Sequence, residues 1–497
     1  MKKIGFDSEK YLSIQTDKIV ERIKQFGGKL YLEFGGKLFD DFHASRVLPG
    51  FAPDNKIKML CKLKHLAEIV IVINSDDIAK NKVRADLGIT YDVDVLRLID
   101  VFRMHGLYVG SIVLSRFNEN NEPAKSFKRK LEKLGLKVYL HYTIKGYPTN
   151  IPAVISDEGF GKNEYVETTR DLVVITAPGP GSGKMATCLS QLYHDYKKGI
   201  KAGYAKYETF PVWSLPLTHP VNIAYEAATA DLNDMNMIDP WHLQAYGETA
   251  VNYNRDVEVF PVLNTLFEKV MKVSPYKSPT DMGVNMAGFA ISNDEVCQEA
   301  SKQEIIRRYF KALENERRNN LDPFESEKIL LLMNSLNVDK SDRAVYKKCV
   351  EAVKIKGVPC SAIQLDCGTI ITGKTSNLFE SQSAALLNAL KYLAGIPDEE
   401  NVLAPETIVP ITKLKVNYLS SQTPRLHIDE TLIALSSSSA TNKHAEKVLK
   451  QLVNLKNAEL HSSVLLPRID VKMLRKLGIN QTSSPVYEEK IPKYEIN

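Results

Sequence analysis

Short runs of β-branched and aromatic residues alternate with helical patterns through the first 205 residues of the chain. The runs lie at residues 29–34, 69–73, 108–114, 137–144 and 172–175. Strands that are separated by helices pair in parallel, and the crossover helices cover both faces of the sheet. The alternation therefore predicts an α/β fold whose N-terminal domain, residues 1–205, holds a Rossmann-like or P-loop-like parallel sheet.

The last of these runs leads into a glycine-rich turn, APGPGSGK, which ends at Lys184 and opens a helical pattern. Glycines let the backbone approach an anion closely, and the first amides of a helix have no partner within the helix. A strand, a glycine-rich turn and a helix in this order favour a phosphate site. The predicted ligand is ATP or another phosphorylated molecule, and the predicted binding residues are Gly179, Gly181, Ser182, Gly183, Lys184 and Thr187.

The turn departs from the Walker pattern G-x-x-x-x-G-K-[ST] at two positions. Pro178 stands in place of the first glycine, and Met185 stands in place of the hydroxyl residue that holds Mg²⁺. Thr187 falls near the same helix face and is a candidate substitute for that hydroxyl. The alternative is a tight turn that needs glycine for close packing and binds nothing.

A second stretch, residues 368–375, fits the same pattern letter for letter. Its four middle residues are all β-branched, which favours a strand over a loop that curls its amides inward. We therefore rank this match below the imperfect turn at Lys184. Thr375 or Ser376 is expected to cap the helix that follows.

Residues 206–283 break the alternation, contain both tryptophans and are dense in Asn, Asp and His. We predict that this segment packs on the first domain and forms the substrate side of the site. Asp231 and Asp234 are three residues apart, so on a helix they would share one face. Each acid or histidine has an alternative role as a hydrogen-bonded structural group. The candidate catalytic residues are His219, Asp231, Asp234 and His242, and the candidate Mg²⁺ ligands are Asp231 and Asp239.

The rest of the 497-residue chain is predicted to form further domains, because a single core does not grow to this size. Residues 284–356 show long amphipathic helical patterns, and residues 357–497 form a second α/β unit. In this unit we expect a hairpin at residues 361–365 and 369–372 and strands at 431–435 and 459–466. Helices are expected at 377–393 and 440–455, the second with a serine from 436–439 as its cap.

Composition excludes several classes of protein. The net charge of +5 on 125 charged residues is close to balance and is not concentrated, so no nucleic-acid partner is expected. No apolar run is long enough to cross a membrane, and charged residues interrupt the N-terminal stretch MKKIGFDSEKY before an apolar signal core forms, so no signal peptide is expected. Six scattered cysteines without C-x-x-C spacing favour a reduced, cytoplasmic protein with neither a zinc site nor a disulfide framework. A homo-oligomer is expected on general grounds.

Four stretches of this sequence resemble a family of bacterial proteins that is catalogued as a domain of unknown function. They are APGPGSGKMATCLSQLYHD, HPVNIAYEAATADLNDMNMIDPWH, YKSPTDMGVNMAG and GTIITGKTSNLFESQSAALLNALK. The resemblance covers essentially the whole chain and implies a multi-domain α/β protein with a helical insert. Some members are labelled ATP-dependent peptidases. The sequence has no G-x-S-x-G, no H-E-x-x-H and no convincing Cys–His pair, so we do not expect peptidase activity.

The leading hypothesis is an enzyme that binds a nucleotide or a phosphorylated metabolite at the glycine-rich turn. Phosphoryl transfer or ATP-dependent activation of a small molecule would then use the acids or histidines of the following segment. One alternative is a nucleotide-sugar-type transferase or hydrolase that places a diphosphate on the same helix end. The other is a metabolite-binding or regulatory protein without catalysis.

Overall fold

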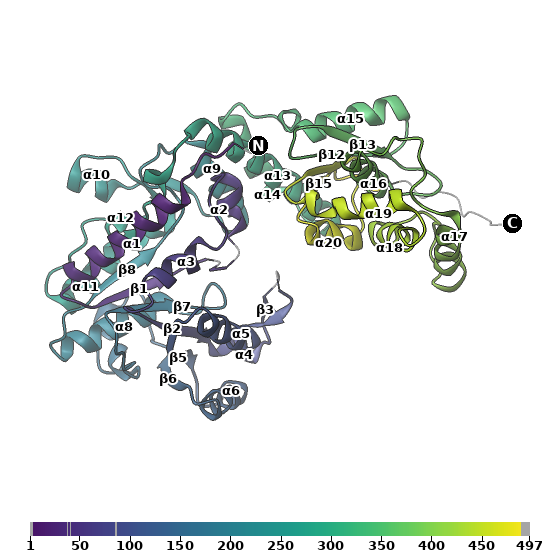
Figure 1. Cartoon of the computed structure of the whole chain (residues 1–497). Coiled ribbons are helices and arrows are strands. Elements are labelled where there is room, and N and C mark those ends of the chain that lie inside the picture. The colour runs from purple at the N-terminus through teal and green to yellow at the C-terminus, as the bar shows by residue number, and fades with distance from the viewer. Residues whose placement is uncertain (1–2, 37, 40, 85–86, 489–497) are drawn as a thin grey trace. The chain divides into compact units, whose positions relative to one another are not determined.

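The computed structural model describes residues 3–488 apart from residues 37, 40, 85 and 86. The chain forms two compact units, an N-terminal unit that spans Ile4–Ser301 and a C-terminal unit that begins at Lys302. Both are visible in Figure 1, the first in purple to teal and the second in green to yellow. The four predicted segments thus fall into two units, and the boundary lies within helix α13 (Asp294–Asn319).

The core of the N-terminal unit is a sheet of seven strands, all paired in parallel. Its order is β11 (Gly283–Val284), β8 (Gly203–Tyr207), β1 (Leu30–Phe34), β7 (Leu172–Thr176), β2 (Ala67–Asn74), β5 (Tyr108–Phe117) and β6 (Lys137–Tyr142). The five predicted strands and the parallel sheet are confirmed. The strands β8 and β11 were missed by the sequence analysis, and β8 joins the 206–283 segment to the sheet.

The two faces of the sheet are covered by different helices, as the alternation of side chains along β1 shows. On one face Phe34 stacks on Tyr207, whose hydroxyl lies 2.6 Å from that of Tyr11 in α1 (Ser8–Gln25). On the other face Tyr31 donates to Asp195 of α8 (Lys184–Lys197) at 2.7 Å. All of β1, β2 and β7 is buried, as expected for strands that are covered on both faces.

The direction of the chain across the sheet reverses at β7. From β1 the chain runs outward through β2, β5 and β6, returns to the centre at β7, and then continues to β8 and β11 on the other side. In parallel sheets of this kind, ligands bind beyond the carboxyl ends of the strands, where the order reverses. The glycine-rich turn follows β7 and therefore occupies this position.

The C-terminal unit contains a four-stranded sheet in the order β13 (Ile370–Lys374), β12 (Cys360–Gln364), β14 (Glu459–Ser462) and β15 (Asn480–Ser483). The predicted hairpin is confirmed, since β12 and β13 pair antiparallel. Helices α14 (Phe324–Ser335) and α15 (Ala344–Lys356) confirm the helical character predicted before residue 357. No helix within the described residues is both long and apolar enough to span a bilayer.

Two details between residues 428 and 450 were predicted wrongly. Residues 431–435 belong to helix α18 (Ile428–Ser438), whose buried residues Ile428, Thr431 and Leu435 recur at helical spacing. The serines 436–439 end this helix, and Asn442 instead caps α19 (Lys443–Lys450). The short run TLIAL resembles a strand when it is considered alone. The buried residues of the whole segment recur at the spacing of a helix.

Residues 368–375, which fit the Walker pattern at every position, form a turn followed by a strand. Its middle residues form β13, as their β-branched character predicts. A Cβ on Gly373 would lie 2.0 Å from the amide nitrogen of Ala385 in α16 (Ser381–Ala394), so this glycine allows close packing of the helix. The helix begins after Glu380, and neither Thr375 nor Ser376 caps it.

Candidate functional site

Two glycines fix the conformation of the turn between β7 and α8. A Cβ on Gly179 would lie 2.2 Å from the hydroxyl oxygen of Tyr91, so only glycine fits against this ring. Gly183 is the N-cap of α8 and has a left-handed backbone with φ of 91°, which glycine adopts without strain. The sequence therefore uses these glycines to bring the backbone tightly around the start of the helix.

The amides at the start of α8 have no acceptor among the residues that the structure describes. Within the described ranges, no acceptor receives the N–H groups of Gly181, Gly183, Lys184 or Met185. Gly181 is exposed, and Lys184 and Met185 are half-buried, so the turn reaches the surface. The Lys184 ammonium also forms no ion pair or hydrogen bond among the residues that the structure describes. The N-terminus of α8, which is the positive end of the helix dipole, and the Lys184 ammonium thus present positive charge together at this turn.

Two of the predicted ligand residues are buried in the protein, and one of them stabilises the turn. Ser182 is fully buried, its hydroxyl donates to the Gly179 carbonyl at 2.8 Å, and its own carbonyl accepts from Ser115 at 2.6 Å. Thr187 is buried, with its hydroxyl 3.5 Å from Nδ1 of His141. Anion binding at this turn would therefore depend on backbone amides and Lys184, without the side-chain hydroxyl of a Walker loop.

The paired carboxylates predicted at Asp231 and Asp234 do not share a helix face. The short helix ends at Leu232, and Asn233 adopts a left-handed backbone with φ of 57°. Asp231 is exposed, whereas Asp234 is buried and forms an ion pair with Arg255 at 2.7 Å. The prediction was wrong because three-residue spacing presents one face only where the helix continues through both residues.

Asp239 is fully buried and caps helix α10 (Pro240–Tyr246). It accepts hydrogen bonds from the amides of Trp241 and His242 at 3.0 Å and from the Thr280 hydroxyl at 2.7 Å. The Thr280 amide adds a fourth bond at 3.2 Å. These donors use the acceptor capacity of the carboxylate, so the alternative reading of Asp239 as a structural group agrees with its surroundings.

His219 and His242 also make structural contacts. His219 caps helix α9 (Pro220–Ala228) through Nδ1, which accepts from the Val221 amide at 3.3 Å, and its Nε2 lies 3.1 Å from Asp294. Nδ1 of His242 lies 3.1 Å from the Ser278 hydroxyl, and both rings are largely buried. No group of three or more His, Cys, Asp or Glu side chains in the described part of the chain is arranged to hold a metal ion.

The structure brings together a charged cluster that the sequence analysis missed. Lys206 of β8 lies between Glu208, at 2.7 Å, and Asp256 of helix α11 (Asn254–Met271), which accepts from its ammonium. Glu33 of β1 is adjacent to Lys206 in the sheet register and accepts from the Tyr204 hydroxyl at 2.7 Å. We call Glu33, Lys206, Glu208 and Asp256 the β8 cluster. The sequence signal for this cluster is Lys206, a charged residue within an otherwise apolar strand. It could not be used, because β8 itself was not predicted.

The protonation of the β8 cluster is perturbed. Burial alone would lower the pKa of Lys206, but the carboxylates of Asp256 and Glu208 raise it above its usual range. Burial raises the pKa of Glu208 to about 7, against the opposing effect of Lys206, and the charge of Asp256 adds to the rise. Glu208 can therefore exchange a proton near neutral pH, which is the property that an acid or base catalyst requires.

The β8 cluster and the glycine-rich turn lie at the same edge of the sheet. β1 separates β7 from β8, and Glu33 is in register with both Ile175 and Lys206. Neighbouring strands lie about 4.8 Å apart, so the carboxyl ends of β7 and β8 are about 10 Å apart. Burial raises the pKa of the Cys188 thiol in α8, and the charge of Glu33 raises it further, whereas the charge of Lys184 opposes the rise. Glu33 of the β8 cluster and Lys184 of the turn are therefore both close enough to act on this one thiol.

Replacing Glu208 with glutamine is expected to change how stability depends on pH. Because the folded protein raises the pKa of Glu208 from 4.5 to about 7, the folded state binds a proton more tightly than the unfolded state. The free energy of unfolding should therefore fall as pH rises from about 4.5 to about 7, by on the order of 1–3 kcal/mol.

Glu208→Gln should remove this part of the slope, as measured by urea unfolding at several pH values. Glu258→Gln, at an exposed position of α11, is the matched control and should keep the slope of the parent. An unchanged slope in Glu208→Gln would show that this carboxyl titrates normally.

The fold and this edge of the sheet define a class: a two-unit α/β protein with a Rossmann-like parallel sheet and a glycine-rich turn at its switch point. The domain described as "Domain of unknown function DUF1846, N-terminal" matches residues 4–337, and "Domain of unknown function DUF1846, C-terminal" matches residues 341–492. The chain belongs to the DUF1846 family, as the resemblance in its sequence predicts.

Its relatives match over nearly the whole chain. UPF0371 protein cu0538 of Corynebacterium urealyticum is 57% identical over 487 residues, which are 98% of each chain. UPF0371 protein SpyM50764 of Streptococcus pyogenes serotype M5 is 56% identical over 488 residues, 98% of this chain and 99% of the relative. UPF0371 protein SUB1165 of Streptococcus uberis is 56% identical over the same length.

Proposed function

We propose that the protein binds a nucleotide such as ATP, or another phosphorylated metabolite, at the turn that precedes Lys184. The observation that carries this proposal is the row of unpartnered amides at the start of α8, next to the unpaired Lys184 ammonium. Amides and a lysine that converge at a helix N-terminus favour phosphate oxygens. Their position at the switch point of a parallel sheet supports the same assignment.

The chemistry we propose is phosphoryl transfer to a small molecule, or ATP-dependent activation of it. The β8 cluster would supply the catalytic groups, in place of His219, Asp231, Asp234 and His242. Glu208 would take a proton from the attacking group, while Lys206 stabilises negative charge. Mg²⁺ would enter the site bound to the phosphates, and it needs only one or two carboxylates from the protein. Glu33 is the candidate ligand, because its register with Ile175 places it nearest the turn among the carboxylates of the β8 cluster. A cytoplasmic location and a homo-oligomeric state remain proposals that agree with this class of ligand.

Binding is tested by thermal unfolding of the parent protein and of Lys184→Ala in the presence of ATP, a nucleotide sugar or a sugar phosphate, with and without Mg²⁺. A ligand at 100 times its dissociation constant stabilises the folded state by about 2.7 kcal/mol. Loss of the lysine should weaken binding about 10- to 100-fold, as expected for a charged hydrogen bond. Lys130→Ala, at an exposed position of α6 (Glu122–Lys133), is the control.

The panel also separates the alternatives. Protection by the nucleotide sugar but not by ATP would select the transferase or hydrolase alternative. Equal stabilisation of the parent and Lys184→Ala by every ligand that binds would contradict the proposed site.

A further inference from the structure

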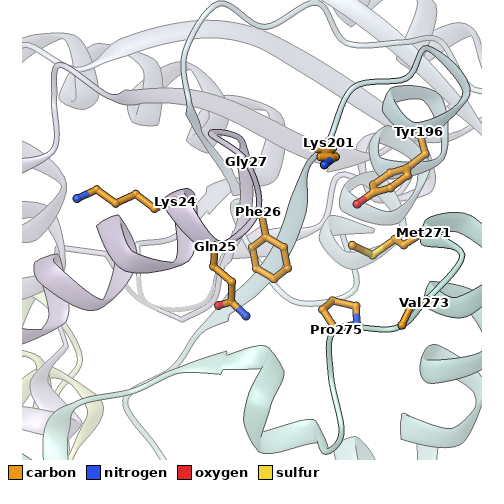
Figure 2. A pocket seen from close by; sticks show the side chains of 9 residues that line it. All are labelled: Lys24, Gln25, Phe26, Gly27, Tyr196, Lys201, Met271, Val273 and Pro275. Carbon is orange, nitrogen blue, oxygen red and sulfur yellow. The ribbon is translucent and has the colours of Figure 1, made fainter.

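A pocket of about 430 Å³ lies at the opposite edge of the N-terminal sheet, where the strands begin (Figure 2). Its walls come from the end of α1, the end of α8, the short connection between α8 and β8, and the end of α11 with the segment that follows it. The volume is within the range of about 300–1,000 Å³ that is usual for small-ligand sites. The lining residues used below are Phe26, Tyr196, Lys201, Met271, Val273 and Pro275.

One wall of the pocket is a fixed aromatic surface. The ring of Phe26 lies over Gly203, where a Cβ would come within 2.0 Å of its atoms, and its centroid is 5.9 Å from that of the buried Tyr276. Met271 and Pro275 lie beside this ring in Figure 2. The Phe26 side chain is therefore held in place by its packing and offers an apolar wall to a ligand.

The polar groups at the pocket favour an anion. Two of the nine lining residues are lysines and none is acidic. The ammonium of Lys201 has no ion-pair partner within the described ranges, and the side chain of Lys24 extends away from Phe26 in Figure 2.

The ends of α1 and α8 at the pocket are capped by backbone hydrogen bonds. Gly28 donates to the Ile23 carbonyl at 2.9 Å and Ile200 to the Asp195 carbonyl at 2.8 Å, so carbonyls at the ends of α1 and α8 are satisfied. Lys201 is then a charge at the rim that no ion pair with a described residue compensates, and unlike Lys24 its side chain does not extend away from the pocket in Figure 2.

From this arrangement we infer that the pocket binds a small amphipathic anion, with an aromatic or short aliphatic body against Phe26 and Met271 and an acidic head on Lys201. The site is separate from the proposed phosphate site, because it lies at the amino ends of β1 and β8 and the glycine-rich turn follows the carboxyl end of β7. Its occupation does not depend on a nucleotide.

The test uses two fluorescent probes of similar size, the anion 8-anilinonaphthalene-1-sulfonate and the uncharged N-phenyl-1-naphthylamine. The parent protein should bind one equivalent of the anion in this pocket. Lys201→Gln should weaken binding of the anion about tenfold, as expected for loss of a charged hydrogen bond, and leave binding of the neutral probe nearly unchanged. Lys130→Gln is the control for a lysine elsewhere on the unit.

Val273→Glu provides a second variant at an exposed position of the rim, where folding should be unaffected. The new carboxylate should repel the anion and weaken its binding at least as much as Lys201→Gln does. Absence of binding by the anion, or equal affinity in the parent, Lys201→Gln and Val273→Glu, would overturn the inference. Equal losses for both probes in Lys201→Gln would also overturn it, since they would indicate a purely structural role for the lysine.

Discussion

Replacing Gly179 with alanine is expected to weaken binding of a phosphorylated ligand by on the order of 100-fold or more, because two or more charged hydrogen bonds from the displaced amides would be lost. The new methyl group would lie 2.2 Å from the Tyr91 hydroxyl and 2.5 Å from Cζ of the same ring. Since the ring is buried, the turn itself has to move. Overpacking of this kind also costs about 1–3 kcal/mol of stability. Calorimetric titration with the best ligand of the panel measures the first effect.

A compensating variant separates displacement of the turn from general damage. Gly179→Ala combined with Tyr91→Ala removes the obstructing ring, so part of the ligand affinity should return although the stability of the double variant is lower still. Ligand affinity that is unaffected in Gly179→Ala would mean that the position of this turn does not matter for binding.

Replacing Glu459 with alanine is expected to destabilise the C-terminal unit by about 3–5 kcal/mol, because it leaves the buried Arg343 guanidinium without its carboxylate partner. Glu459 pairs with Arg343 at 2.8 Å and with Arg307 at 2.9 Å, and the Arg343 side chain is only 1% exposed. Glu446→Ala, which breaks an exposed pair with Lys450 in the same unit, should leave stability nearly unchanged, because water screens the pair. Urea unfolding followed by circular dichroism compares the two variants. Similar losses in both would show that burial of the Glu459 network adds nothing.

The parallel sheet could be predicted because its central strands β1, β2 and β7 are fully buried. Runs such as residues 69–73 and 172–175 are continuous and apolar, and each is followed or preceded by a helical pattern of ordinary length. β8 could not be recognised in the same way, because Lys206 interrupts it and its burial depends on partners far away in the sequence. β11 is only two residues long and carries no pattern at all.

The turn before Lys184 was predicted from its local sequence, whereas the roles of the surrounding polar residues required the tertiary structure. Asp239 and His219 each follow the pattern of a helix cap, with a proline next in sequence, and the structure uses both as caps. The histidines and acids that the sequence analysis selected as catalytic candidates therefore include residues whose role is to cap a helix by local hydrogen bonds. The β8 cluster combines residues from β1, β8 and α11, and no spacing within the chain could have brought Glu33 next to Lys206.

Hydrogen exchange in the peptide that covers residues 177–187 is the most direct test of the proposed phosphate site. The amides of Gly181, Gly183 and Lys184 lack acceptors in the described part of the chain and should exchange rapidly in the free protein. A phosphorylated ligand that raises the melting temperature should slow exchange in this peptide more than in any other. The account is contradicted if such a ligand binds, protects another part of the chain and leaves exchange at residues 177–187 unchanged.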